Sequence, residues 1–125
     1  MSEPLPISVL LLARDETREL SALLPALAFA REVVVVWDPR GDPGTRDAAM
    51  RLGARVIERA FDGFGAQRQF ALSLCREPWV LWVDADEQPA AGFEDALRRW
   101  LAASPAADGA TVERVSWFLG RRIRQ

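Results

Sequence analysis

The sequence predicts an α/β fold with a mostly parallel sheet that carries helices on both faces. Two observations support this class. Short apolar runs alternate along the chain with segments of helical periodicity, which is the pattern of repeated strand–helix units. Several of these runs are apolar throughout, as in strands that are buried on both faces of a sheet. With 125 residues, we expect one domain, 1–125, built around a single core.

The expected elements follow in order: strand 7–13, helix 16–30, strand 32–37, helix 46–52, strand 54–58, helix 66–76, strand 78–83, helix 90–103 and a final extended segment 110–119. The first strand is apolar without interruption, and the second is nearly pure valine, which favours strands. Pro25 should kink or break the first helix, because proline removes a helical donor. Gly53 should end the second helix as a C-terminal stop.

Loops and the last helix are also marked in the sequence. Pro, Gly and Asp make 38–45 a turn-forming loop by composition. The helix 90–103 should turn its apolar residues inward, namely Phe93, Leu97, Trp100 and Leu101. We expect a turn over 104–109 before the final segment.

Absent residue types restrict the chemistry. The chain has no His, Lys, Tyr or Asn, and all sixteen basic residues are Arg. Ser-His-Asp and Cys-His catalysis, Schiff-base chemistry and His-ligated zinc are therefore excluded within this sequence. Cys75 is the single cysteine and fits a packed helix position. Acid–base work is left to Asp and Glu, while the arginines suit phosphate.

Charge and hydropathy narrow the partners. A net charge of −2 gives no basic footprint for nucleic acid, so none is expected as a partner. No apolar stretch approaches the length of a membrane span, and no signal peptide precedes Ile7. The expected location is the cytoplasm.

The strand 78–83 ends in a group of carboxylates, Asp84, Asp86 and Glu87, closed by Pro89. Alternation along an extended backbone would project Asp84 and Asp86 to the same side. Two such oxygen ligands suit Mg²⁺ or Mn²⁺, with a substrate diphosphate completing the coordination shell. A second interpretation is an acidic N-cap for the following helix, which accounts for Glu87 but not for the two aspartates.

Polar residues follow three of the expected strands, at 14–16, 38–42 and 84–87. The carboxyl ends of parallel strands meet at one edge of the sheet, where α/β proteins bind their ligands. Three convergent loops predict a ligand crevice there.

Five segments stand in an informative order: 7–16, 33–45, 63–72, 83–87 and 117–121. The third reads Gly-Phe-Gly-Ala-Gln-Arg-Gln-Phe-Ala-Leu, and the fourth reads Val-Asp-Ala-Asp-Glu. In this order they resemble the N-terminal half of an inverting family 2 glycosyltransferase with the GT-A fold. Bacterial lipopolysaccharide-core and related cell-envelope sugar transferases are the most similar members. The resemblance covers essentially the whole chain.

The resemblance implies a nucleotide-sugar donor, such as a UDP-sugar. It places Asp38 on the uracil or ribose, with Asp15 and Glu16 lining the same nucleoside pocket. Asp15 stands where the family usually has Asn, and Asp42 is shifted one place from the usual spacing. Gln69 replaces another usual Asn.

The resemblance also assigns the phosphate and metal contacts. Arg68, early in its helix, would face the diphosphate. Asp84 would reach the ribose or the metal's water shell, and Asp86 would bind Mg²⁺ or Mn²⁺ directly. The metal would neutralise the departing nucleoside diphosphate.

Family members continue well beyond a donor-binding half, and the later part usually supplies the acceptor site and the catalytic base. We therefore expect a GT-A half-domain truncated after its donor-binding part and inactive alone, with no catalytic base identified. The full-length form would associate peripherally with the inner membrane. A non-catalytic binding or assembly module stays open as the alternative. A nucleotidyltransferase is less favoured, because no Gly-rich loop follows the first strand.

The C-terminal segment is apolar, with Val112, Val115, Trp117, Phe118 and Leu119. An uncovered apolar edge strand pairs readily with another chain. We expect a homo-oligomer formed through this strand.

Overall fold

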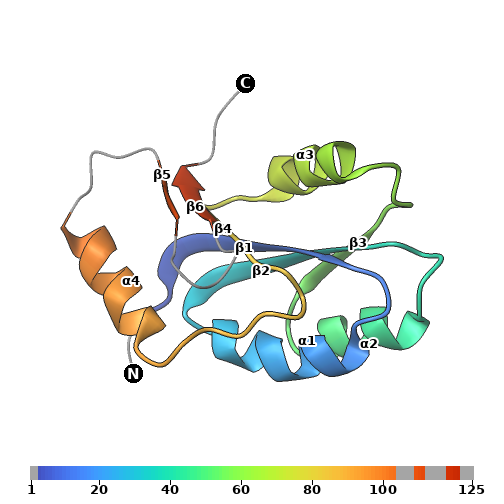
Figure 1. The fold of residues 1–125 in the computed structure, drawn as a ribbon, viewed down its shortest axis with the longest axis horizontal. Helices are drawn as coiled ribbons and strands as arrows, with labels where there is room; N and C mark the ends of the chain where they lie inside the picture. Colours follow the sequence, from blue (N-terminus) through green and yellow to red (C-terminus); the bar gives the residue numbers. More distant parts are fainter. Residues whose placement is uncertain (1–2, 104–108, 112–117, 122–125) are drawn as a thin grey trace.

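The computed structural model describes residues 3–103, 109–111 and 118–121. Within these residues the strands form one mixed sheet in the order β3-β2-β1-β4-β6-β5 (Figure 1). The strands are β1 (Leu5–Ala13), β2 (Ala30–Trp37), β3 (Arg55–Glu58), β4 (Trp79–Trp82), β5 (Gly109–Thr111) and β6 (Phe118–Arg121). The first four are parallel to one another, and β6 runs antiparallel to both β4 and β5.

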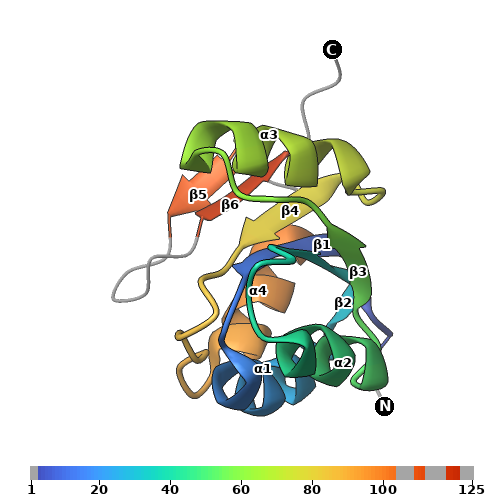
Figure 2. The same ribbon diagram turned by 90° about the vertical axis from the view of Figure 1, so that its right-hand side faces the viewer.

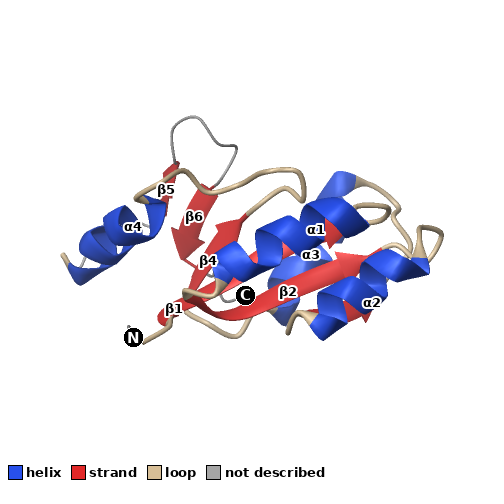
Figure 3. Cartoon of the chain, turned by 90° about the horizontal axis from the view of Figure 1, so that it is seen from below, coloured by secondary structure: helices blue, strands red, loops and turns tan. Residues whose placement is uncertain are grey.

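Helices cover both faces of the sheet, as the sequence predicts. They are α1 (Thr17–Leu23), the 3₁₀ helix η1 (Leu24–Leu27), α2 (Pro43–Arg51), α3 (Phe64–Leu74) and α4 (Phe93–Ala102). Helix α3 lies on one face, and α1, α2 and α4 lie on the other (Figures 1 and 2). Seen from below, α1 and α2 lie side by side in front of the sheet (Figure 3).

The central strand β1 explains why its sequence is apolar throughout. Val9 and Leu11 belong to the core under α1 and η1, while Leu10 belongs to the core under α3. All three are fully buried. Side chains alternate along a strand, so a strand between two helical layers needs apolar residues at every position.

Proline sets two helix boundaries on this side of the sheet. Pro25 falls in the first turn of η1, so the α-helix ends at Leu23, which confirms the expected break. The prediction that this helix reaches residue 30 is wrong, because Ala30 begins β2. Helix α2 begins at Pro43 rather than residue 46 because proline is favoured at the first helical position.

Two glycines with positive φ precede the later helices. Gly63 (φ 129°) comes before α3, which starts at Phe64 and not at residue 66. Gly92 (φ 82°) comes before α4, so residues 90–92 are not helical, although the sequence predicts a helix from residue 90. Leu97 of α4 is buried, and Phe93, Trp100 and Leu101 pack against the same core, which confirms the predicted inner face.

The final segment differs from its prediction. Instead of one extended stretch over 110–119, β5 and β6 are two strands that pair antiparallel with each other. Because β6 also pairs with β4, it is flanked on both sides and is not an open edge. Val112, Val115 and Trp117 lie outside the described residues, as does most of the turn expected at 104–109.

Candidate functional site

The three polar loops lie at one edge of the sheet, as predicted. They follow β1, β2 and β4, which run parallel in adjacent positions. The chain order reverses at β1, since β2 lies on one side of it and β4 on the other. Open α/β sheets bind their ligands beyond the strand ends at such a reversal.

Asp38, directly after β2, is held by its own chain. Its Oδ1 accepts from the backbone N–H and from Nε of Arg40, both at 3.0 Å. Its Oδ2 accepts from Arg40 Nη2 at 2.7 Å and from the backbone N–H of Phe61 at 3.3 Å. The side chain is 3% exposed. Two carboxylate oxygens offer about four acceptor sites, so these four donors saturate them.

This arrangement determines the protonation state of the pair. The hydrogen bonds from the Arg40 side chain, and then from its backbone N–H, hold the pKa of Asp38 well below its usual range. The same hydrogen bond and the negative charge of Asp38 raise the pKa of Arg40. The pair therefore remains an ionised, bidentate contact at neutral pH.

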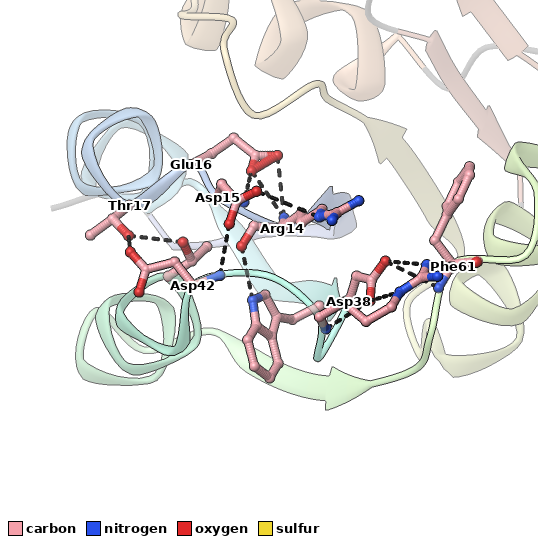
Figure 4. A network of polar contacts seen from close by, with 10 residues as sticks. Arg14, Asp15, Glu16, Thr17, Asp38, Asp42 and Phe61 are labelled. Carbon is pink, nitrogen blue, oxygen red and sulfur yellow. Dashed lines mark hydrogen bonds and ion pairs between the residues drawn. The ribbon is translucent and has the colours of Figure 1, made fainter.

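A tight turn carries this pair. Gly41 N–H donates to the Asp38 carbonyl at 2.9 Å, so Pro39 and Arg40 occupy the middle of the turn. Aspartate, proline and glycine are favoured at these turn positions. Arg40 Nη2 also donates to the Phe61 carbonyl at 2.8 Å, which joins this turn to the loop before α3. Figure 4 shows Asp38 directed towards Phe61.

The loops after β1 and β2 are tied together by backbone contacts. Asp42 N–H donates to Asp15 Oδ1 at 2.8 Å and to the Arg14 carbonyl at 3.2 Å. Trp37 Nε1 donates to the same carbonyl at 3.1 Å. A Cβ on Gly41 would lie only 2.3 Å from that carbonyl oxygen, so a side chain there does not fit without movement.

The carboxylates of Asp15 and Glu16 accept hydrogen bonds from the backbone of the loops after β1 and β2 (Figure 4). The Glu16 carboxylate accepts from Arg14 N–H at 3.0 Å and from Asp15 N–H. Thr17 Oγ1 shares a hydrogen bond with Thr45 Oγ1 at 2.8 Å, which links α1 to α2. Asp15, Glu16 and Asp38 are thus brought together as predicted, but each is engaged by its own chain.

The carboxylates after β4 have the opposite character. Asp84 and Asp86 are exposed on either side of buried Ala85. The backbone is a turn rather than extended, since Glu87 N–H donates to the Asp84 carbonyl at 3.0 Å. Glu87 Oε1 accepts from Asp84 N–H at 3.1 Å. Among the described residues, neither Asp84 nor Asp86 has a hydrogen bond or ion pair through its carboxylate.

Glu87 therefore closes the turn, and it is not the N-cap of α4, whose N-cap is Gly92. The acidic-cap interpretation of this cluster is wrong. The two aspartates are left free to take a ligand.

Arg68 lies beside the same strand. Its guanidinium carbon stands 4.1 Å from the centroid of the Trp82 ring, a cation–π contact that orients an otherwise exposed side chain. Trp82 ends β4 two residues before Asp84. The contact therefore places the guanidinium of Arg68 against the strand that precedes the aspartates.

Two residues of this edge were not singled out by the sequence. Gln67 is buried, accepts from Arg59 Nη1 at 2.6 Å and donates to the Arg59 carbonyl at 2.9 Å, which anchors α3 to the chain after β3. Arg40 is the other. The Asp-Pro-Arg-Gly turn signature was the available signal for Arg40, because such a turn brings its third residue back over the first.

The donor set at the turn after β4 fits a hard divalent cation only in part. No group of three or more metal-ligating side chains occurs in the described part of the chain. Two carboxylates suit Mg²⁺ or Mn²⁺, which usually binds one or two carboxylates and takes its other ligands from phosphates and water. Asp84 and Asp86 would supply these two carboxylates, and the remaining ligands would have to come from a phosphate and water.

The family is defined by comparison with known proteins. Residues 18–124 match the model of glycosyl transferase family 2. The chain therefore belongs to this family of glycosyltransferases.

Individual relatives agree. The lipopolysaccharide core biosynthesis glycosyltransferase LpsC of Rhizobium meliloti is 29% identical over 96% of this chain and 46% of its own length. The glycosyltransferase RC0292 of Rickettsia conorii is 30% identical over 73% of this chain and 32% of its own length. The chain thus spans about half or a third of these curated relatives.

Solved structures show the same fold. The mannosyltransferase PcManGT from Pyrobaculum calidifontis, in complex with GDP-Man and Mn²⁺, superposes with a TM-score of 0.75 at 20% identity, covering 98% of this chain and 46% of that one. Glucosyl-3-phosphoglycerate synthase from Mycobacterium tuberculosis, in complex with UDP, gives a TM-score of 0.68 at 18% identity, covering 93% and 56%. The GT-A fold expected from the sequence is confirmed. None of the described helices has the length and apolar character needed to cross a membrane.

Proposed function

We propose that this chain binds a nucleoside-diphosphate sugar together with Mg²⁺ or Mn²⁺, as the donor-binding part of a glycosyltransferase. The observation that carries the proposal is the exposed pair Asp84 and Asp86 at the carboxyl end of β4. These two negative charges lie two residues apart and have no partner in the described chain, and a divalent cation would lower their mutual repulsion.

Each group at the edge has a role in this proposal. Asp86 would bind the cation directly, with Asp84 on the cation or on the ribose. The bound cation would supply Lewis-acid neutralisation of the leaving diphosphate. Arg68 would add a guanidinium contact to the same diphosphate. The framework around Asp15, Glu16 and Asp38 would form the nucleoside side of the crevice.

The similarity to LpsC supports a place in cell-envelope glycan synthesis, with a lipopolysaccharide-core acceptor. Peripheral attachment to the inner membrane and self-association remain part of the proposal. Light scattering of the purified chain checks the latter, and a monomer at high concentration would count against it.

The test is calorimetric titration of UDP and of GDP into the chain, with Mn²⁺ and then with EDTA. We expect one of the two nucleotides to bind in Mn²⁺ and to bind at least about tenfold more weakly without it, as for loss of a charged contact. A folded chain that binds neither nucleotide would overturn the proposal and favour a non-catalytic assembly module.

A further inference from the structure

We infer that Arg40, which is bound to Asp38, recognises the base of the donor nucleotide by donating hydrogen bonds to the base's carbonyl oxygens. A free carboxylate at this place would instead accept hydrogen bonds from the base's N–H groups. This inference rests on the proposed function and concerns the specificity of the same site. Arg40, which follows β2, would then determine which bases the site binds.

Asp38 has no acceptor left for a ligand. Four donors of the chain occupy its two oxygens, three of them from Arg40. A base N–H could bond to Asp38 only after Arg40 had been displaced. Displacement would leave a buried carboxylate short of donors, which is strongly unfavourable.

Arg40 lies between Asp38 and solvent. The Asp38 side chain is 3% exposed, whereas that of Arg40 is 55% exposed. Two of the Arg40 side-chain nitrogens, Nε and Nη2, are engaged on Asp38 and on the Phe61 carbonyl. Nη1 donates to no described residue, so its two N–H groups remain for a ligand.

Arg40 is fixed by contacts within the chain before any ligand binds. Its backbone N–H donates to Asp38, and the Gly41 N–H closes the turn. Gly41 itself packs against the Arg14 carbonyl with no room for a side chain. A guanidinium fixed in this way loses little further conformational entropy when it binds, which favours its use as a recognition group.

The position matches a nucleoside site. In doubly wound α/β sheets with such a reversal, an acidic residue beyond the first βα turn hydrogen-bonds the ribose, so the attached base lies close to it. Here that acid is covered by a donor group. The ligand that fits has carbonyl acceptors on its base, such as O2 and O4 of uracil or O6 of guanine.

The test compares Arg40→Met with the unmutated chain in Mn²⁺ by calorimetry, with UDP, GDP and the base-free ribose 5-diphosphate as ligands. We expect the tighter-binding nucleotide to lose about ten- to a hundredfold in affinity, as for a hydrogen bond to a charged group. Binding of ribose 5-diphosphate should not change. Arg31→Met is the matched control, because Arg31 is 52% exposed, pairs with Glu77 and lies at the opposite end of β2.

A second measurement needs no variant and so does not depend on the folding of Arg40→Met. The unmutated chain is titrated with 3-methyl-UDP, or with 1-methyl-GDP where GDP binds more tightly. Methylation removes the ring N–H and keeps the carbonyl oxygens, although guanine also keeps its exocyclic amino group. We therefore expect affinity within about threefold of the parent nucleotide, which is less than one hydrogen bond is worth.

Several outcomes would overturn the inference. A tenfold or larger loss on N-methylation would mean that the chain reads the N–H. Equal or tighter nucleotide binding by Arg40→Met would mean that Arg40 only blocks the site. An equal loss for ribose 5-diphosphate would mean a phosphate contact. Failure of the unmutated chain to bind any nucleotide would overturn the proposed function as well, whereas the other results leave it standing.

Discussion

The loop after β2 and the turn after β4 lie at the same edge of the sheet and both present aspartates, yet their carboxylates are in opposite states. Asp38 is buried and accepts four hydrogen bonds from its own chain. Asp84 and Asp86 are exposed, and their carboxylates contact no donor in the described chain. The acceptors of Asp38 are occupied within the chain, whereas those of Asp84 and Asp86 are open to solvent.

The difference shows that the role of a carboxylate depends on the donors around it. At Asp38 the donors are Arg40 and Phe61, so the charge organises a loop and presents a guanidinium to solvent. At the turn after β4, Glu87 takes the structural hydrogen bond and leaves the two aspartates available for a cation. A nucleoside diphosphate with its cation would span both.

The largest effect is expected from Asp86→Asn, which removes one of the two proposed cation ligands. Nucleotide affinity in Mn²⁺ should fall about a hundredfold. Loss of an outer-shell partner of a metal ligand costs about 10- to 100-fold, and loss of a direct ligand should cost at least the upper value. Because Asp86 is exposed, the free energy of unfolding should change by no more than about 0.5 kcal/mol. Calorimetry and urea unfolding measure the two effects. Asp47→Asn, an exposed carboxylate on α2, is the control and should bind normally.

Gly41→Ala should disrupt the loop after β2. The added Cβ would meet the Arg14 carbonyl oxygen at 2.3 Å, so overpacking should cost about 1–3 kcal/mol of unfolding free energy. Gly65→Ala is the matched control, because a Cβ there meets nothing within 4 Å and the residue lies in α3. Alanine should leave stability equal or raise it by up to about 1 kcal/mol. Equal stability of the two variants in urea would contradict this account of the loop.

Arg68→Ala should weaken nucleotide binding by about tenfold, as for one charged hydrogen bond. Loss of its contact with Trp82 should cost only about 0.5–1 kcal/mol of stability, since the site is exposed. The measurements are calorimetry and thermal unfolding, with Arg31→Ala as the control. If affinity for UDP and GDP is unchanged, Arg68 does not contact the diphosphate.

The last effect is the pH dependence of stability that Asp38 contributes. Its pKa is lowered in the folded chain from an ordinary value of 3.8. The folded state therefore binds fewer protons, so the contact stabilises fully above about pH 4 and loses this contribution as pH falls further. Asp38→Asn should be less stable than the unmutated chain at pH 7, and urea unfolding at pH 3 should show a smaller gap. A gap that is equal or larger at pH 3 would be inconsistent with the lowered pKa.

The fold was predictable because its strongest signals are local. The apolar runs at β1 and β2, the break at Pro25 and the stop at Gly53 all act on their own segments. Element starts at Phe64 and at Phe93 were misplaced, since positive-φ glycines fixed them. The pairing of β5 with β6 is a contact between separate segments, which periodicity alone does not define.

The position of the edge carboxylates was predictable, but the contacts that each of them makes were not. Position after a strand identifies Asp38, Asp84 and Asp86 as edge residues, and the sequence finds all three. Whether each carboxylate is covered depends on neighbours such as Arg40 and on a Phe61 backbone 23 residues away. Such a contact exists only once the chain has folded.

We propose that the turn after β4 holds the cation while the loop after β2 keeps its own ion pair. The most direct measurement is paramagnetic broadening of backbone amide signals by Mn²⁺ in the presence of UDP or GDP. We expect the strongest broadening at residues 84–87, weaker broadening at residues 38–42, and loss of both in Asp86→Asn. Broadening centred on residues 38–42, or unchanged in Asp86→Asn, would contradict this proposal.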